Sequence, residues 1–191
     1  MKQAVLLLAD EWDLGKKASH AEGNICAWIY LLDCLAESET IIKYKEGKKL
    51  IGFCGYSKNN SHKHLIKKNF YKFIKKRLYK SPKIKNLEAL KQYEINYNYT
   101  PSNLQNYFDG EISILIVDKN YRGKNIGKKL LTTTFELAKK DNMNNLQILT
   151  DESCNYKFYE KLGCNKILQT KIKNKNTNQI IEMAFIYEKK L

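Results

Sequence analysis

The chain of 191 residues is strongly basic and contains enough apolar residues to form a core. Its 34 Lys and Arg residues outnumber its 20 Asp and Glu residues, which gives a formal charge of +14, and 43% of the residues are hydrophobic. This length fits one globular domain better than two. The charge alone does not predict nucleic-acid binding, because the lysines are spread along the whole chain and such charges are usually solvated.

The apolar runs exclude a protein with a membrane-spanning helix, and the cysteines indicate neither a disulfide-linked nor a metal-binding one. The longest runs, "AVLLLA" and "ICAWIYLLDCLA", are shorter than the roughly 20 residues that a membrane-spanning helix needs. The start of the chain lacks the small-residue cleavage site of a secretory signal. Five cysteines without a CxxC pair or a matching His spacing indicate neither a disulfide framework nor a metal site. A cytoplasmic location is therefore expected.

Two helices and a β-hairpin are predicted for the first 58 residues. A helix over 3–14 places one set of apolar side chains on one side, namely Val5, Leu6, Leu8, Ala9 and Trp12. Residues 24–37 are apolar nearly all round, as in a buried helix. The β-rich runs within 39–58, joined by a turn at Glu46-Gly47-Lys48, predict the hairpin.

Residues 61–80 predict an amphipathic basic helix that ends at Ser81-Pro82. Its apolar residues fall near one face, namely Leu65, Ile66, Phe70, Phe73, Ile74 and Leu78, with lysines largely around them. One interpretation is a membrane-surface or partner helix. The favoured one is a helix laid over the sheet with its lysines in solvent. Tyrosines and asparagines cluster in the segment that follows, and we expect the region 61–107 to determine substrate specificity.

Strands and helices alternate over the rest of the chain. Strands are predicted at 112–117 and 145–151, and helices at 125–140 and 153–162, the second stopped by Gly163. Residues 164–172 and 179–191 predict a closing hairpin. The whole pattern indicates a single α/β or α+β domain, with helices on the faces of a mixed sheet.

The stretch "DKNYRGKNIGKKLL" at 118–131 joins a strand to a helix through a basic turn. Unpaired N–H groups at such a helix start form an anion site, and a phosphate is the expected ligand. The Walker A loop is excluded because Gly123 lies only four positions before Gly127, and Lys128 is not followed by Ser or Thr. A dinucleotide-binding GxGxxG is excluded because Lys124-Asn125 stands where the second glycine is needed.

The turn resembles the pyrophosphate-binding signature of the GNAT superfamily of acyl-CoA-dependent N-acyltransferases. Residues 122–127 match its pattern of Arg or Gln, two residues, Gly, one residue, Gly or Ala, with Asn125 where the family usually has glycine. Asn adopts left-handed backbone conformations more readily than most residues. The stretch "LQILTDESCNYKFYEKLGCNK" at 146–166 is similar to the family's strand and Tyr-bearing helix. The resemblance covers about the last half of the chain.

The resemblance implies one N-acetyltransferase-like domain over 1–191, with an inserted helical basic segment at about 61–107. It implies a mostly antiparallel twisted sheet, a bulge in strand 112–117, and a splayed strand pair that forms the cleft for CoA. It further implies acetyl-CoA as co-substrate, no metal, and direct acetyl transfer to a primary amine of a small-molecule or peptide acceptor. Homodimers are common in the family, but these residues fix neither the oligomeric state nor the acceptor.

The resemblance also implies the residues of the site. The cofactor-binding residues are Leu115, Ile116, Val117, Arg122, Gly123, Lys124, Asn125, Ile126, Gly127, Lys128 and Asn155. Tyr159 aligns with the family's Tyr and is predicted to be the general acid. Glu111 is the candidate general base, with Asp109 as its alternative. The family's usual CoA-contacting Asn falls at Glu152, so that contact is not carried over.

Cys154 and Cys164 are predicted to be buried free thiols, because His20, His62 and His64 are far away in sequence. Two other functions stay open from the residues alone. The departures at Asn125 and Glu152 are compatible with a non-catalytic CoA-binding or partner-binding domain. Alternatively, helix 61–80 binds nucleic acid or an anionic surface.

Overall fold

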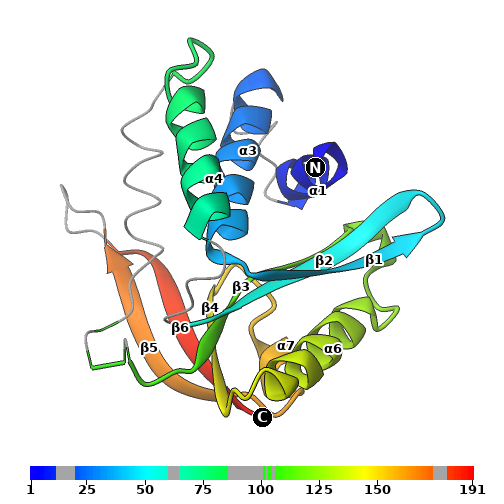
Figure 1. The fold of residues 1–191 in the computed structure, drawn as a ribbon, viewed down its shortest axis with the longest axis vertical. Coiled ribbons are helices and arrows are strands. Elements are labelled where there is room, and N and C mark those ends of the chain that lie inside the picture. Colours follow the sequence, from blue (N-terminus) through cyan, green and yellow to red (C-terminus); the bar gives the residue numbers. More distant parts are fainter. Residues whose placement is uncertain (12–19, 60–64, 86–100, 102, 105, 174–179) are drawn as a thin grey trace.

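The computed structural model describes residues 1–11, 20–59, 65–85, 101, 103–104, 106–173 and 180–191, and its fold is a mixed α+β domain (Figure 1). Six described strands form one sheet in the order β1-β2-β3-β4-β6-β5. The strands are β1 (Thr40–Glu46), β2 (Lys49–Lys58), β3 (Gly110–Val117), β4 (Asn145–Asp151), β5 (Asn165–Lys173) and β6 (Ile180–Lys190). The helices are α1 (Lys2–Glu11), α3 (His20–Glu37), α4 (Leu65–Leu78), the 3-10 turn η1 (Lys119–Tyr121), α6 (Ile126–Lys140) and α7 (Lys157–Glu160).

The sheet is mostly antiparallel, as expected. Only the pairing of β3 with β4 is parallel among the described strands. Helices α1, α3 and α4 lie on one side of the sheet, and α6 and α7 lie on the other (Figure 1). Each side has its own apolar core. The core under α6 includes Ile51, Leu131, Leu146, Ile148 and Tyr187, and the core under α1 and α3 includes Val5, Leu8, Leu31, Phe53 and Ile116.

A β-bulge in β3 changes which residues face each core. Ile112 pairs with Tyr56 of β2, while Ile114 pairs with the preceding residue Gly55, so Ser113 is the extra residue. Ile112 packs in the α6 core, but Ile114 belongs to the core under α1 and α3. In a regular strand these two residues would face the same side. The bulge predicted for this strand is therefore present.

The parallel pairing of β3 with β4 stops at the bulge. It joins Gly110 to Leu146, Glu111 to Gln147 and Ile112 to Ile148, and no later pair is formed. Beyond Ile112 the two strands diverge, while β3 stays paired with β2 as far as Val117. The expected splayed strand pair is confirmed, and beyond Ile112 no described strand pairs with the edge of β3 that faces β4.

Helix α4 is present, but its faces are not arranged as predicted. It packs mainly on α3. Ile66, Phe70 and Phe73 are 89%, 58% and 57% exposed. Lys68 instead pairs with Glu37 at 2.5 Å, and Lys75 pairs with Asp33. Lys72, Lys76 and Arg77 are exposed, as expected. The helix lies against α3 rather than over the sheet, however, and Lys68 and Lys75 face carboxylates on α3.

Other departures from the expected elements are small. Leu6, expected on the buried side of α1, is 59% exposed, and α7 is shorter than the helix predicted over 153–162. Gly163 follows α7 with φ of +70°, as a helix stop requires. Trp12 and residues 61–64 and 86–100 lie outside the described residues. Within the described ranges, no helix combines the length and the apolarity needed to cross a membrane.

Deleting Ser113 tests the bulge. Without Ser113, Ile112 and Ile114 become consecutive, as their partners Tyr56 and Gly55 in β2 are. Every other β3 side chain then keeps its present side of the sheet. We expect cooperative thermal unfolding to persist, with stability lowered by about 1–2 kcal/mol and Tm by a few degrees. Deleting Leu115 is the matched control, because it moves Ile116 and Val117 to the wrong sides and should abolish the transition. Equal melting of the two deletion variants by circular dichroism would contradict the bulge.

Candidate functional site

A groove of about 640 Å³ lies where the end of β3, the following turn, the start of α6 and the segment around α7 meet. Its lining includes ten of the eleven residues predicted to bind the cofactor: Leu115, Ile116, Val117, Arg122, Gly123, Asn125, Ile126, Gly127, Lys128 and Asn155. Only Lys124 does not line it. The groove therefore brings the unpaired part of β3 together with the glycine turn.

The turn before α6 has the geometry of an anion site. Asn125, the N-cap of α6, has φ of 60° and ψ of 14°, so it adopts the left-handed conformation for which Asn is suited. Gly123 has φ of +78°. The first intrahelical hydrogen bond at this end is donated by the Lys129 N–H to the Asn125 carbonyl at 3.0 Å. The N–H groups of residues 126–128 precede it, and they point out of the helix start together with its dipole.

Asp118 fixes the turn from the strand side. Its backbone N–H donates to the Ile51 carbonyl at 2.7 Å, and its carboxylate accepts from the Asn120 N–H at 3.0 Å. Lys49 pairs with the same carboxylate at 2.9 Å. The hydrogen bond from Lys49 holds the pKa of Asp118 below its ordinary value, so the carboxylate stays ionised. The turn is thus anchored before any ligand binds.

Two cations of the turn, Arg122 and Lys124, already have partners within the chain. The Arg122 guanidinium pairs with Glu11 at the end of α1, and Glu11 also lines the groove. The Lys124 ammonium lies 4.7 Å from the centre of the Tyr121 ring. An anion bound at the turn would therefore compete with Glu11 for Arg122, since both carry negative charge.

The opposite wall of the groove comes from the segment after β4. The Asp151 carboxylate accepts from the Ser153 N–H at 2.9 Å and from the Cys154 N–H at 3.2 Å. This turn brings Ser153, Cys154 and Asn155 to the groove. A side chain added at Gly127 would lie 3.3 Å from the Phe158 ring, which is tighter than ordinary contact. Glycine at this position lets α6 and α7 approach each other.

Tyr159 lines the groove beside this wall. Its ring packs against Tyr187 with centroids 5.8 Å apart. Burial raises the pKa of the Tyr159 phenol far above its ordinary value. The hydroxyl is thus protonated throughout the physiological range, as a proton donor must be.

Glu111 does not line the groove. It lies on β3 just before the bulge, where it pairs with Gln147 in the parallel ladder. Burial, and then the charge of Glu37, raise the pKa of the Glu111 carboxyl, against the opposing effect of Lys68. Asp109, the alternative, has a lowered pKa because the Asn144 backbone N–H donates to it at 2.6 Å. The raised pKa of Glu111 favours proton uptake by its carboxyl, whereas the lowered pKa of Asp109 disfavours proton uptake.

The part of the chain that forms most of the groove is similar to a known protein family. Residues 90–164 match the model of the acetyltransferase (GNAT) family. The resemblance to the GNAT superfamily is confirmed. The matched region contains the turn at 122–127, the split between β3 and β4, and Tyr159. The sequence matches no curated protein.

The fold is that of solved GNAT-like structures. The protein PH1933 from Pyrococcus horikoshii OT3 is 22% identical, with a TM-score of 0.56, and the match covers 100% of this chain and 94% of that one. A polyamine N-acetyltransferase of Drosophila melanogaster, which forms N-acetylagmatine, is 14% identical with a TM-score of 0.51, over 79% of this chain and 74% of that one.

An N-acetyltransferase from Staphylococcus aureus Mu50 is 16% identical, and 78% of this chain is covered, with a TM-score of 0.47. The match covers 66% of the length of that protein.

Several residues that line the groove were not expected from the sequence. Glu11, Tyr121, Ser153 and Phe158 line it. Ser153 and Phe158 belong to the stretch that carries the resemblance, but no local signal links Glu11 to a turn more than a hundred residues later. Cys154, expected to be buried, is exposed and lines the groove, whereas Cys164 is buried as predicted. Although the residue as a whole is exposed, partial desolvation of the Cys154 thiol raises its pKa to about 11, which disfavours the nucleophilic thiolate.

Replacing Glu11 tests its competition with the ligand. Glu11→Gln removes a carboxylate that now neutralises Arg122, so acetyl-CoA should bind about two- to fivefold more tightly, as an exposed ion pair of 0.2–1 kcal/mol allows. Asp10→Asn is the control, because Asp10 pairs at 2.7 Å with Lys119, which does not line the groove. Isothermal titration calorimetry measures both. Unchanged affinity for Glu11→Gln would contradict the competition.

Proposed function

We propose that the protein is an N-acetyltransferase that moves an acetyl group from acetyl-CoA directly to a primary amine. The observation that carries this proposal is the continuity of one groove. It runs from the turn at 122–127, along the edge of β3 that is not paired with β4, to Tyr159. A ligand with a pyrophosphate, an extended amide-bearing arm and a reactive thioester needs these features in this order.

The residues of the groove fit such a ligand. The free N–H groups at the start of α6 suit the pyrophosphate, with Arg122 and Lys128 as charge partners. Lys124, beside the turn, adds a further cation. The unpaired backbone of Leu115 and Val117 suits the amides of the pantetheine arm, which would bind as an added strand. Asn155 provides a polar contact from the opposite wall.

Bound acetyl-CoA supplies an activated acetyl thioester. The acceptor nitrogen attacks its carbonyl carbon, a C–N bond forms, and the C–S bond breaks. Free N–H groups of β3 beyond the bulge would hydrogen-bond the carbonyl oxygen as negative charge develops on it. Tyr159 would hold its O–H proton close to the sulfur that leaves. The transfer needs no covalent bond to the protein.

Glu111 is proposed to accept the proton that the amine loses. It lies beside the closed end of the splayed strands, on the side where α3 and α4 pack. Its raised pKa makes it a better proton acceptor than an ordinary surface carboxylate. Its carboxylate and that of Glu37 would also attract a cationic amine, despite the basic character of the whole chain. The acceptor itself would be selected by the 61–107 segment.

The first test is thermal melting with acetyl-CoA, with ATP as the polyphosphate control. A ligand at about one hundred times its dissociation constant adds roughly 2.7 kcal/mol to the stability of the folded state. We expect acetyl-CoA, but not ATP, to raise Tm. Release of free thiol from acetyl-CoA in the presence of a panel of amines then tests transfer. Stabilisation without transfer to any amine would favour a non-catalytic CoA-binding domain.

Tyr159→Phe tests the proton donor. Removing the hydroxyl should lower kcat by about a hundredfold or more, while the dissociation constant for acetyl-CoA changes little. Tyr156→Phe is the matched control, because the Tyr156 ring packs on Phe185 at 4.5 Å and does not line the groove. Turnover of Tyr159→Phe equal to that of the unmodified protein would rule out the acid role.

Glu111→Gln tests the base through activity and through pH. Because burial raises the pKa of Glu111, the folded chain binds this proton more tightly than the unfolded chain, and stability falls as pH rises through that interval. The variant should therefore gain Tm relative to the unmodified protein at pH 7 but not at pH 4, while kcat falls. Asp109→Asn should show the opposite trend, since the pKa of Asp109 is lowered. A loss of Tm at pH 7 for Glu111→Gln would contradict the assignment.

A further inference from the structure

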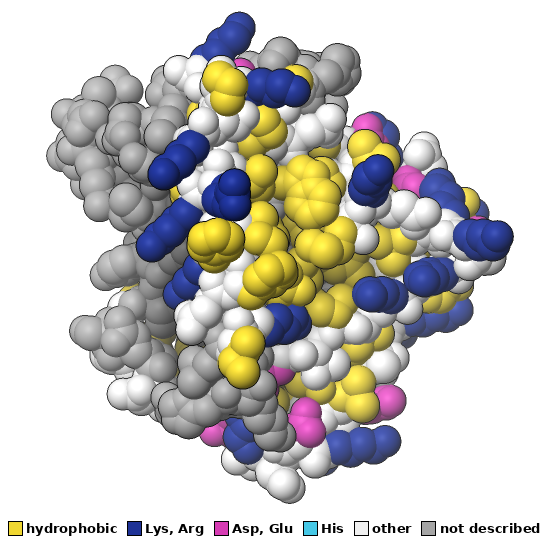
Figure 2. All heavy atoms as spheres, turned by 45° about the horizontal axis from the view of Figure 1, so that its top comes forward, with side chains coloured by type: hydrophobic (Ala, Val, Ile, Leu, Met, Phe, Trp, Pro, Cys, Tyr) yellow, Lys and Arg dark blue, Asp and Glu magenta, His cyan; other side chains and the backbone are white. Residues whose placement is uncertain are grey.

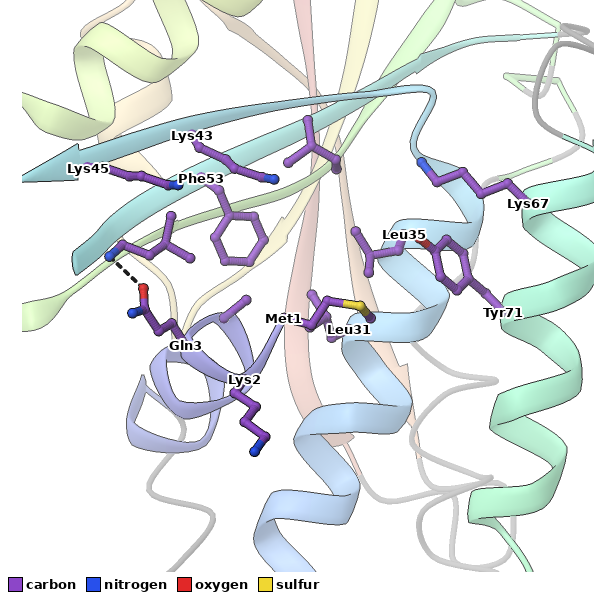
Figure 3. Close-up of a pocket in the computed structure, with 13 residues that line it drawn as sticks. Met1, Lys2, Gln3, Leu31, Leu35, Lys43, Lys45, Phe53, Lys67 and Tyr71 are labelled. Carbon is purple, nitrogen blue, oxygen red and sulfur yellow. Dashed lines mark hydrogen bonds between the residues drawn. The ribbon is translucent and has the colours of Figure 1, made fainter. Parts of the chain in front are cut away.

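A second cavity, of about 600 Å³, lies on the opposite side of the sheet, between α1, α3, α4 and the β1-β2 hairpin (Figure 3). It shares no lining residue with the groove at the glycine turn. Its size falls in the range of small-molecule sites. It is therefore separate from the proposed acetyl-CoA site.

The floor of the cavity is apolar. It is built by side chains from four elements, namely Ala4, Leu31, Leu35, Ile41, Leu50 and Phe53. Leu31, Leu50 and Phe53 are buried core residues whose outer atoms form the floor, and Tyr71 of α4 lines it from the side. Figure 2 shows hydrophobic side chains gathered at the centre of this side of the molecule, with Lys and Arg side chains around them.

Four lysines border the floor: Lys2, Lys43, Lys45 and Lys67. Among the described residues that line the cavity there is no Asp or Glu. Lys43 and Lys45 follow Ile41 at every second position of β1, so their side chains lie on the same side of the strand and project toward the cavity (Figure 3). Ile42 and Tyr44, on the other side of β1, pack against the α6 core.

Other groups of the chain balance the positive charges of these lysines only weakly. Lys67 donates to the Ser38 carbonyl at 3.2 Å. Burial, and then the positive charge of Lys43, lower the pKa of Lys67. Among the described residues, neither Lys43 nor Lys45 forms an ion pair. A negative charge placed between these ammonium groups would relieve their repulsion.

An apolar floor with a cationic border matches one class of ligand. We propose that this cavity binds a small amphiphilic anion, a fatty acid of medium chain length, with its hydrocarbon on the floor and its carboxylate between Lys43, Lys45 and Lys67. The burial of the hydrocarbon supplies the affinity, and the lysines select the charge. Lysines on an edge strand also hinder strand-to-strand aggregation, but that role needs no hollow beside them.

Isothermal titration calorimetry with sodium decanoate, below its micelle concentration, tests the site on the full chain. Decanoate should bind with a negative heat-capacity change, because apolar surface is buried. Acetate, which lacks the chain, and decanol, which lacks the charge, should each bind about tenfold more weakly or worse. Saturating acetyl-CoA should leave the decanoate affinity unchanged, because the two sites share no residue.

The double variant Lys43→Gln, Lys45→Gln should weaken decanoate binding about five- to tenfold. Lys139→Gln, Lys140→Gln is the matched control, since it removes the same charge from the last turn of α6, away from both cavities. An equal loss in both variants would overturn the proposal, as would absence of decanoate binding or its displacement by acetyl-CoA. Binding to phosphatidylglycerol vesicles without binding of monomeric decanoate would also overturn it, in favour of an anionic surface.

Discussion

The parallel pairing of β3 with β4 ends after Ile112 and Ile148, and the candidate site depends on that early end. Ser113, the extra residue of the bulge, turns the strand so that Ile114 faces the α1 and α3 core while Ile112 stays under α6. A strand that continued beside β4 would use its backbone groups in the ladder and leave no opening. The bulge therefore creates both the groove and the free hydrogen-bonding edge inside it.

The ligands proposed for the two sides of the sheet differ because the charged groups on the two sides differ. On the α6 side, backbone amides and Arg122 form a compact anion site at a helix start. On the other side, separated lysines border an apolar hollow, which suits an anion with a hydrocarbon body. The overall charge of +14 does not distinguish these environments. The positions of the carboxylates do, since Glu11 lines the first site and no acid is found among the described residues that line the second.

Two other carboxylates, on α3, explain why α4 lies as it does. Asp33 and Glu37 on α3 attract Lys75 and Lys68, which turns Phe70 and Phe73 outward. An amphipathic pattern predicts that a helix has two faces, but not which face a neighbour will cover. Here the ion pairs form between residues far apart in sequence, so no local pattern could have shown them. Glu37 also raises the pKa of Glu111, which links α3 to the proposed general base.

The sequence by itself determined the local features of this protein. The hairpin turn at Gly47, the strand at Gly110–Val117, the left-handed Asn125 and the start of α6 follow from residue types whose backbone preferences act over a few neighbours. The tertiary structure alone decided which distant residues meet them. The contact of Glu11 with Arg122, the position of the bulge at Ser113, the exposure of Cys154 and the cavity bordered by lysines arise from packing between separate elements. Such contacts depend on the relative placement of helices and strands, which short-range sequence patterns do not encode.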